Sequence, residues 1–293
     1  MKNAEFSSTR TAKDWGGGCE RRARMLPENA FLRKLPNTID EAQAIKLEGL
    51  VFSADAVEFS FNEIKRIALI FGEKITDAPS GVRTRVFIDA WNMVDNLHVI
   101  RQVIKSMDVA GERTDEFLAK YETASLLRNK MDHLAANAFN ISKASKRNPL
   151  HGSVSYAYVP ESEIKEVDGK LTLNGAGIVV ISSGRLVPKS SIAVVNPAGM
   201  LISDRAGLFQ LEAFGLVLNL ENAVRDMSAY LMKINDSFEE NFLKTITNIA
   251  VEKGLNVDDL KHNNAAGLTV YLTVKFTPPS IASEGETDPS SGA

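Results

Sequence analysis

Apolar residues recur at helical spacing through the first half of the chain and again in a later stretch. Over 39–71 and 82–107 the apolar positions follow one another mostly at steps of three, four or seven. This spacing places them on one face of a helix. The same pattern runs from 114 to at least 138 and returns over 219–250. The sequence therefore predicts three helices in succession and a long fourth helix.

Between the third and fourth predicted helices the pattern becomes that of strands. Residues 153–159 alternate small or polar with apolar side chains, which is typical of a half-buried strand. Asp168-Gly169 is a hairpin turn signal. Further strand-like runs cover 177–181, 191–195, 208–218 and 268–276. Helices and strands are thus segregated, which predicts an α+β fold with an antiparallel β-meander rather than alternating βαβ units.

The first predicted helix carries signals at both ends. Thr38 and Glu41 have the spacing of a capping box, in which each side chain satisfies one free backbone N–H. Gly72 is a plausible stop, because glycine readily adopts the backbone conformation that ends a helix. We therefore expect the helix to begin beside Thr38 and to end at Gly72.

Composition divides the chain into four segments. Residues 1–36 hold eight Lys and Arg against four Asp and Glu, a net charge of +4, and are expected to form a flexible basic arm, either solvated or in contact with nucleic acid. Residues 37–150 are expected to form a helical bundle. Residues 151–277 carry the β-meander and the long helix (219–250), which packs on the bundle. Residues 278–293 are expected to form a disordered acidic tail.

Overall composition excludes several function classes. The 293 residues are 44% hydrophobic and 24% charged, with a net charge of −3, so nucleic acid can bind only at a local basic patch. The single cysteine, Cys19, cannot form an internal disulfide. The four histidines lie far apart, and we expect neither a metal site nor a cofactor. No apolar run approaches the roughly 18 residues of a membrane span, and the start lacks the apolar core of a secretion signal. A cytoplasmic protein without membrane association is expected.

One short motif in the third predicted helix carries candidate chemistry. At about 100° per residue, Asp132 lies about 40° from Arg128, with Asn129 at about 100° and His133 at about 140°. The apolar residues of this stretch fall on the opposite side. The four polar residues therefore share the face that is turned away from the core.

These side chains suit the cleavage of a phosphodiester bond. A histidine with an ordinary pKa of about 6.5 takes or gives a proton at neutral pH. Arginine offers a rigid fork to phosphate oxygens and stabilises developing charge there. Asn129 is suited to orienting the nucleophile or fixing the imidazole tautomer. No metal is required if the RNA 2′-hydroxyl is the nucleophile.

The sequence Arg128-Asn129-x-x-x-His133 resembles the Arg-polar-x-x-x-His motif of HEPN domains. These domains are typically small helical bundles that dimerise so that two motifs face each other, and many are metal-independent endoribonucleases. The resemblance implies Arg128, Asn129 and His133 as catalytic residues, with Lys130 and Asp132 binding substrate. RNA would be cut by its own 2′-hydroxyl, leaving a cyclic phosphate. The implied partners are RNA, a second copy of the chain and a protein partner such as an antitoxin.

The resemblance has limits that are visible in the sequence. The β-meander is not part of the minimal HEPN fold. One subgroup of HEPN toxins has a tyrosine, modified by a partner enzyme, where this chain has Ala135, so that regulation is not expected. The bacterial context implied is a toxin–antitoxin pair or phage defence.

Two features of the motif's surroundings bear on this interpretation. Residues 120–151 hold six Lys and Arg against two Asp and Glu, a balance that suits either an RNA backbone or the end of a helix. Asp89 and Asp95 on the second helix are candidate partners for Arg128. The alternative is a non-catalytic HEPN-like dimerisation, nucleotide-binding or partner-binding protein, with Arg128 and Asp132 as an ordinary ion pair.

Overall fold

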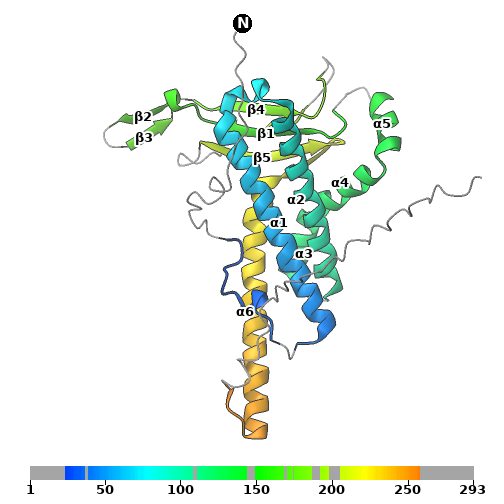
Figure 1. The fold of residues 1–293 in the computed structure, drawn as a ribbon, viewed down its shortest axis with the longest axis vertical. Helices are drawn as coiled ribbons and strands as arrows, with labels where there is room; N and C mark the ends of the chain where they lie inside the picture. Colours follow the sequence, from blue (N-terminus) through cyan, green and yellow to red (C-terminus); the bar gives the residue numbers. More distant parts are fainter. Residues whose placement is uncertain are drawn as a thin grey trace, which may run out of the picture.

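The computed structural model describes residues 24–36, 39–107, 111–143, 149–167, 170–173, 175–186, 192–197 and 205–257. Two long helices, α1 (Glu41–Phe71) and α2 (Ser80–Ser106), lie side by side and lean against a sheet at one end. A third long helix, α6 (Leu220–Lys253), starts at the sheet and extends well beyond it (Figure 1). The fold is mixed helix and sheet, which confirms the predicted α+β class.

The third predicted helix is in fact three helices. They are α3 (Glu112–Lys120), α4 (Glu122–Asp132) and α5 (Leu134–Lys143). The remaining helical segments are the short η2 (Phe31–Arg33), η3 (Gly72–Asp77) and η4 (Glu161–Glu163). The chain leaves the helical conformation at Tyr121 (ψ 18°) and at His133 (ψ 34°). Tyr121 is drawn away because its hydroxyl bonds to α6, at 2.6 Å from Asp226 and 3.1 Å from the carbonyl of Asn222. The prediction of one continuous helix over 114–138 is therefore wrong.

Helix α1 begins and ends through identifiable contacts. Its cap is Asp40, whose carboxylate accepts from the N–H of Gln43 at 3.0 Å; Thr38, the predicted cap, lies outside the described residues. Gly72 ends the helix with a φ of 47°, as predicted. A Cβ at Gly72 would lie 2.5 Å from ring atoms of Tyr158, so a side chain there would clash as well as strain the backbone.

The sheet is antiparallel, with strand order β4-β1-β5-β6. Its strands are β1 (Ser153–Tyr158), β4 (Gly177–Ser182), β5 (Ala206–Ala213) and β6 (Leu216–Asn219); β2 (Ile164–Val167) and β3 (Lys170–Leu173) pair separately. Val167 is opposite Lys170, so β2 and β3 pair as the predicted hairpin requires, while the turn residues 168–169 lie outside the described residues. The order is not the predicted simple meander, because β1, buried along its whole length, lies between β4 and β5. Residues 192–196 form no strand, and 268–276 lie outside the described residues.

The hydrophobic core joins the sheet to α1. Alternate strand residues face the helix, among them Tyr156 on β1 and Phe209 on β5, whose rings stack at 5.0 Å. Phe61 of α1 meets Phe209 edge-on at 5.6 Å. The first part of α6 belongs to the same core through Leu220, Met227 and Leu231, among other residues.

Residues 24–36 differ from the flexible arm expected for 1–36. Leu26 and Leu32 are fully buried, and Arg33 forms two bonds to Asp55 of α1, at 2.7 and 2.5 Å. The hydroxyl of Ser228 on α6 donates to the carbonyl of Met25 at 3.1 Å. This segment is thus packed between α1 and α6. The rest of the predicted arm, 1–23, and the predicted acidic tail, 278–293, lie outside the described residues.

Within the described part of the chain, none of the helices combines the length and the apolar character needed to cross a membrane.

Candidate functional site

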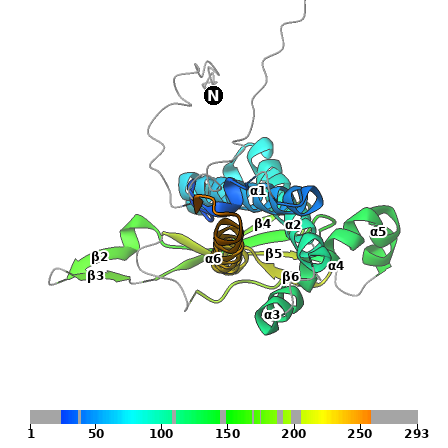
Figure 2. The same ribbon diagram turned by 90° about the horizontal axis from the view of Figure 1, so that it is seen from below.

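The predicted site residues lie at the end of α4, on the side of the molecule where α4 and α5 flank α2 (Figures 1 and 2). Arg128 and Lys130 are half-buried, whereas Asn129 and Asp132 are exposed. His133 is exposed and occupies the break between α4 and α5. The polar face expected from the sequence therefore faces solvent.

Arg128 is held by carboxylates from two helices. Its Nε lies 2.9 Å from Oδ1 of Asp95 on α2, and its Nη1 bonds to Asp132 one turn later on α4. The contact with Asp95 confirms one of the two predicted partners. Asp89 instead accepts from Arg85 at 2.8 Å within α2. The guanidinium of Arg128 is therefore oriented on the surface by α2 as well as by its own helix.

Two ionisable groups of α2 are affected by this arrangement. Partial burial raises the pKa of Asp95, while the charge of Arg128 acts in the opposite direction. Burial and, second, the positive charge of Arg128 lower the pKa of His98. The Nδ1 of His98 lies 3.0 Å from the hydroxyl of Ser125 on α4. The pKa of His98 therefore lies below its ordinary value, and His98 belongs to the α2–α4 contact.

Asn129 and His133 take no part in the ion pairs of Arg128. A continuous helix would rise about 7.5 Å and turn by about 140° between Arg128 and His133, but α4 ends at Asp132 and His133 lies in the break before α5. Asn129 lies one turn before His133 and nearer its side of the helix. Among the described contacts, neither Asn129 nor His133 has a side-chain partner. Within a single chain, no described contact joins Arg128 to His133.

Arg101 on α2 positions α4, a role the sequence did not reveal. It is only 5% exposed. Its Nε and Nη2 donate to the carbonyl of Leu118 near the end of α3, at 3.0 and 2.8 Å, and its Nη1 donates to the hydroxyl of Ser125. The available signal was its place between Leu97 and Ile104 on the apolar stripe of α2. An arginine there is buried and must find acceptors.

Asp226 of α6 holds the same α3–α4 corner from the other side. It accepts from the Tyr121 hydroxyl at 2.6 Å and pairs with Lys120. Burial alone would raise the pKa of Asp226, but these two donors keep it below its ordinary value. Because its charge is paired with Asp226, Lys120 does not add to the basic zone predicted over 120–151. Lys143, Lys146 and Arg147 of that zone lie outside the residues whose side chains are described.

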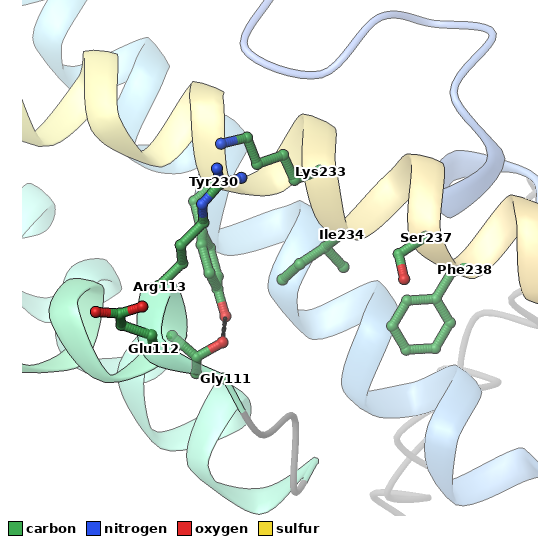
Figure 3. A pocket seen from close by; sticks show the side chains of 9 residues that line it. Gly111, Glu112, Arg113, Tyr230, Lys233, Ile234, Ser237 and Phe238 are labelled. Carbon is green, nitrogen blue, oxygen red and sulfur yellow. Dashed lines mark hydrogen bonds between the residues drawn. The ribbon is translucent and has the colours of Figure 1, made fainter.

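A groove between α3 and α6 contains none of the predicted site residues. It is lined by the first residues of α3 and by residues 230–238 of α6, and has a volume of about 370 Å³ (Figure 3). Sequence spacing indicated only that Ile234 and Phe238 belong to an apolar stripe. The groove forms because α3 leaves the bundle and crosses α6.

The described residues contain no cluster of three or more His, Cys, Asp or Glu side chains that could hold a metal ion. In the comparisons with known proteins, no family model, curated protein or solved structure matches this chain.

Proposed function

We propose that this chain is a metal-independent endoribonuclease of the HEPN type that acts as a homodimer. In this proposal α1, α2 and α4 belong to a HEPN-like bundle, and Arg128, Asn129 and His133 are the catalytic residues. Lys130 and Asp132 line the path of the RNA. The biological setting implied by the family resemblance is a bacterial toxin or a defence component.

The observation that carries the proposal is the ion pair between Asp95 and Arg128. It orients a guanidinium whose side chain is 35% exposed at the surface. An oriented, solvent-accessible arginine is suited to binding a phosphate oxygen and stabilising its charge as the 2′-hydroxyl attacks. Because Asp132 competes for the same guanidinium, bound RNA would displace this carboxylate.

A second copy of the chain supplies what one copy lacks. Since no described contact brings Arg128 and His133 of one chain together, the proposal places a two-fold axis beside α4 that sets Arg128 of one protomer near His133 of the other. The imidazole would then exchange protons with the attacking and leaving oxygens. Val99 of α2 and Leu126 of α4 follow the contacting pair His98 and Ser125 and are 41% and 43% exposed. Such apolar side chains are suited to an interface.

The test is RNA cleavage in the presence of EDTA. Arg128→Ala and His133→Ala are each expected to lower cleavage by at least about 100-fold, the usual contribution of a charge-stabilising donor and of a general acid–base group, respectively. Arg83→Ala and His151→Ala, which change exposed residues of the same types elsewhere, are expected to keep full activity. The products should end in a cyclic phosphate, and a 2′-deoxy nucleotide at the cut should block cleavage.

Mixing the two inactive variants tests the shared site. Heterodimers of Arg128→Ala and His133→Ala would keep one intact composite site, so activity should return to about a quarter of wild type after exchange of subunits. Absence of cleavage by the wild type, or cleavage that persists in both variants, would refute the nuclease proposal. Inactive mixtures would refute the composite site alone.

A second candidate is a non-catalytic partner-binding protein, and the surface of α1 favours it. Ile45, Phe52 and Phe59 are 62%, 72% and 64% exposed. Their seven-residue spacing places them on one face, as in a helix that packs against another helix. In this case Phe52→Asp with Phe59→Asp would turn a dimer into a monomer in sedimentation, while the wild type cleaves no RNA.

A further inference from the structure

The groove between α3 and α6 has a closed, mostly apolar floor. Tyr230 is 9% exposed and stacks on Phe117 of α3 with ring centroids 4.6 Å apart and planes 8° apart. Its hydroxyl is 3.1 Å from that of Thr114, itself 7% exposed. This hydrogen bond satisfies the hydroxyl of Tyr230, which therefore needs no ligand as a partner. The floor is therefore rigid and apolar before any ligand arrives.

The floor continues along α6 in one direction. Tyr230, Ile234 and Phe238 line the groove at steps of four residues, so they share one face and span about 12 Å along the helix axis. That length suits an extended medium-chain acyl group. The volume of about 370 Å³ lies in the range of about 300–1,000 Å³ that is usual for small-molecule sites.

Two positively charged side chains lie at one end of this floor. Figure 3 shows the side chains of Arg113 and Lys233 reaching toward each other beside Tyr230, while the carboxylate of Glu112 points away from them. Among the residues that the structure describes, neither Arg113 nor Lys233 has a hydrogen-bond or ion-pair partner. Two like charges that converge without a counter-charge repel each other, and a bound anion would relieve this repulsion.

We infer that this groove binds a small anion with an apolar body, of the class of medium- or long-chain carboxylates. The acyl chain lies along Tyr230, Ile234 and Phe238, and the carboxylate meets Arg113 and Lys233. A nucleotide fits less well, because the floor offers few hydrogen-bonding groups with which to hold a base or a ribose. The site is separate from Arg128 and His133 and does not depend on nuclease activity.

The test is calorimetric titration of the full-length protein with dodecanoate below its micelle concentration. Three probes separate the contributions of charge and chain: acetate has the charge without the chain, dodecyltrimethylammonium has the chain with the opposite charge, and adenosine monophosphate represents a nucleotide. We expect saturable binding of dodecanoate alone. A double variant, Arg113→Gln with Lys233→Gln, should raise its Kd at least tenfold.

A second variant tests the floor without touching the charges. Ser237 lines the groove and is exposed, so Ser237→Trp should fill the groove and abolish binding while leaving the circular dichroism spectrum unchanged. Arg83→Gln is the matched control and should bind as wild type. The inference fails if dodecanoate does not bind, if it binds equally to the double variant or to Ser237→Trp, if dodecyltrimethylammonium binds as tightly, or if adenosine monophosphate binds in its place.

Discussion

Two arginines at the contact between α2 and α4 differ in environment and in what they can do. Arg101 is buried and donates to a main-chain carbonyl and a hydroxyl. Arg128, one turn along α4 from Ser125, is 35% exposed in its side chain and meets two carboxylates. The first fixes the corner between α3 and α4, whereas the second keeps part of its guanidinium open to solvent. A charged group thus serves the fold where it is buried and is available for chemistry where it is not.

Loss of Arg101 should give the largest change in stability. Arg101→Ala removes the hydrogen bonds to Leu118 and Ser125 and leaves a cavity, so the free energy of unfolding should fall by about 3 kcal/mol. Urea unfolding followed by circular dichroism measures this change, with Arg83→Ala on the same helix as control. A fall no larger than that of Arg83→Ala would show that Arg101 does not hold the corner.

The opposite anchor of the same corner should have a smaller effect. Asp226→Asn keeps an acceptor for the Tyr121 hydroxyl but loses the carboxylate charge that strengthens this bond and pairs with the exposed Lys120. We expect a loss of about 1 kcal/mol in unfolding free energy. Lys244→Gln, which disrupts an exposed ion pair with Glu240, serves as the comparison and should lose less. If both variants lose the same unfolding free energy, Asp226 contributes no more to stability than an ordinary surface carboxylate.

Arg128 should matter little for stability. Its two ion pairs are solvent-accessible, and pairs of this kind contribute about 0–1 kcal/mol, so Arg128→Ala should unfold within about 1 kcal/mol of wild type in the same urea experiment. This result is also what allows the cleavage assay to be interpreted, since lost activity could not then be ascribed to unfolding. A loss as large as that of Arg101→Ala would remove the distinction between the two arginines.

The smallest expected effect is a pH dependence at His98. Because burial and the charge of Arg128 lower its pKa in the folded chain, the unfolded chain binds this proton more readily, at an ordinary pKa of about 6.5. The stability contribution is therefore present above pH 6.5 and is lost as the pH falls toward the lower folded value. Imidazole NMR should show the His98 pKa rising in Arg128→Ala, and His98→Gln should flatten this part of the stability curve. An unchanged His98 titration in Arg128→Ala would contradict the proposed coupling.

The long elements were predictable because burial along them is periodic. The stop of α1 at Gly72, the helix that became α6 and the hairpin of β2 and β3 all follow from local patterns. The breaks at Tyr121 and His133 were not predictable, because the apolar stripe continues across both. Tyr121 leaves the helix for a partner more than 100 residues away in the sequence.

The candidate site was predicted in part. The motif could place Arg128 and Asn129 on the polar side of a helix but not His133 in the break that follows it, and the acids of the second helix suggested a partner for Arg128. That Asp95 rather than Asp89 is this partner depends on how α2 and α4 cross. The motif could not reveal the role of Arg101 or the groove beside Tyr230, because each depends on contacts between segments that no short sequence pattern connects.

The sequence by itself determined the long helices α1, α2 and α6 and most of the strands, the apolar face of each helix and the few residues that carry reactive side chains. These properties depend on neighbours within a turn or a strand, where spacing alone decides the geometry. The tertiary structure decided where α3, α4 and α5 separate, which arginine is buried and which is open, and where two cations meet an apolar floor. Those features depend on contacts between distant segments, and only the packed chain brings their side chains within a few ångströms of each other.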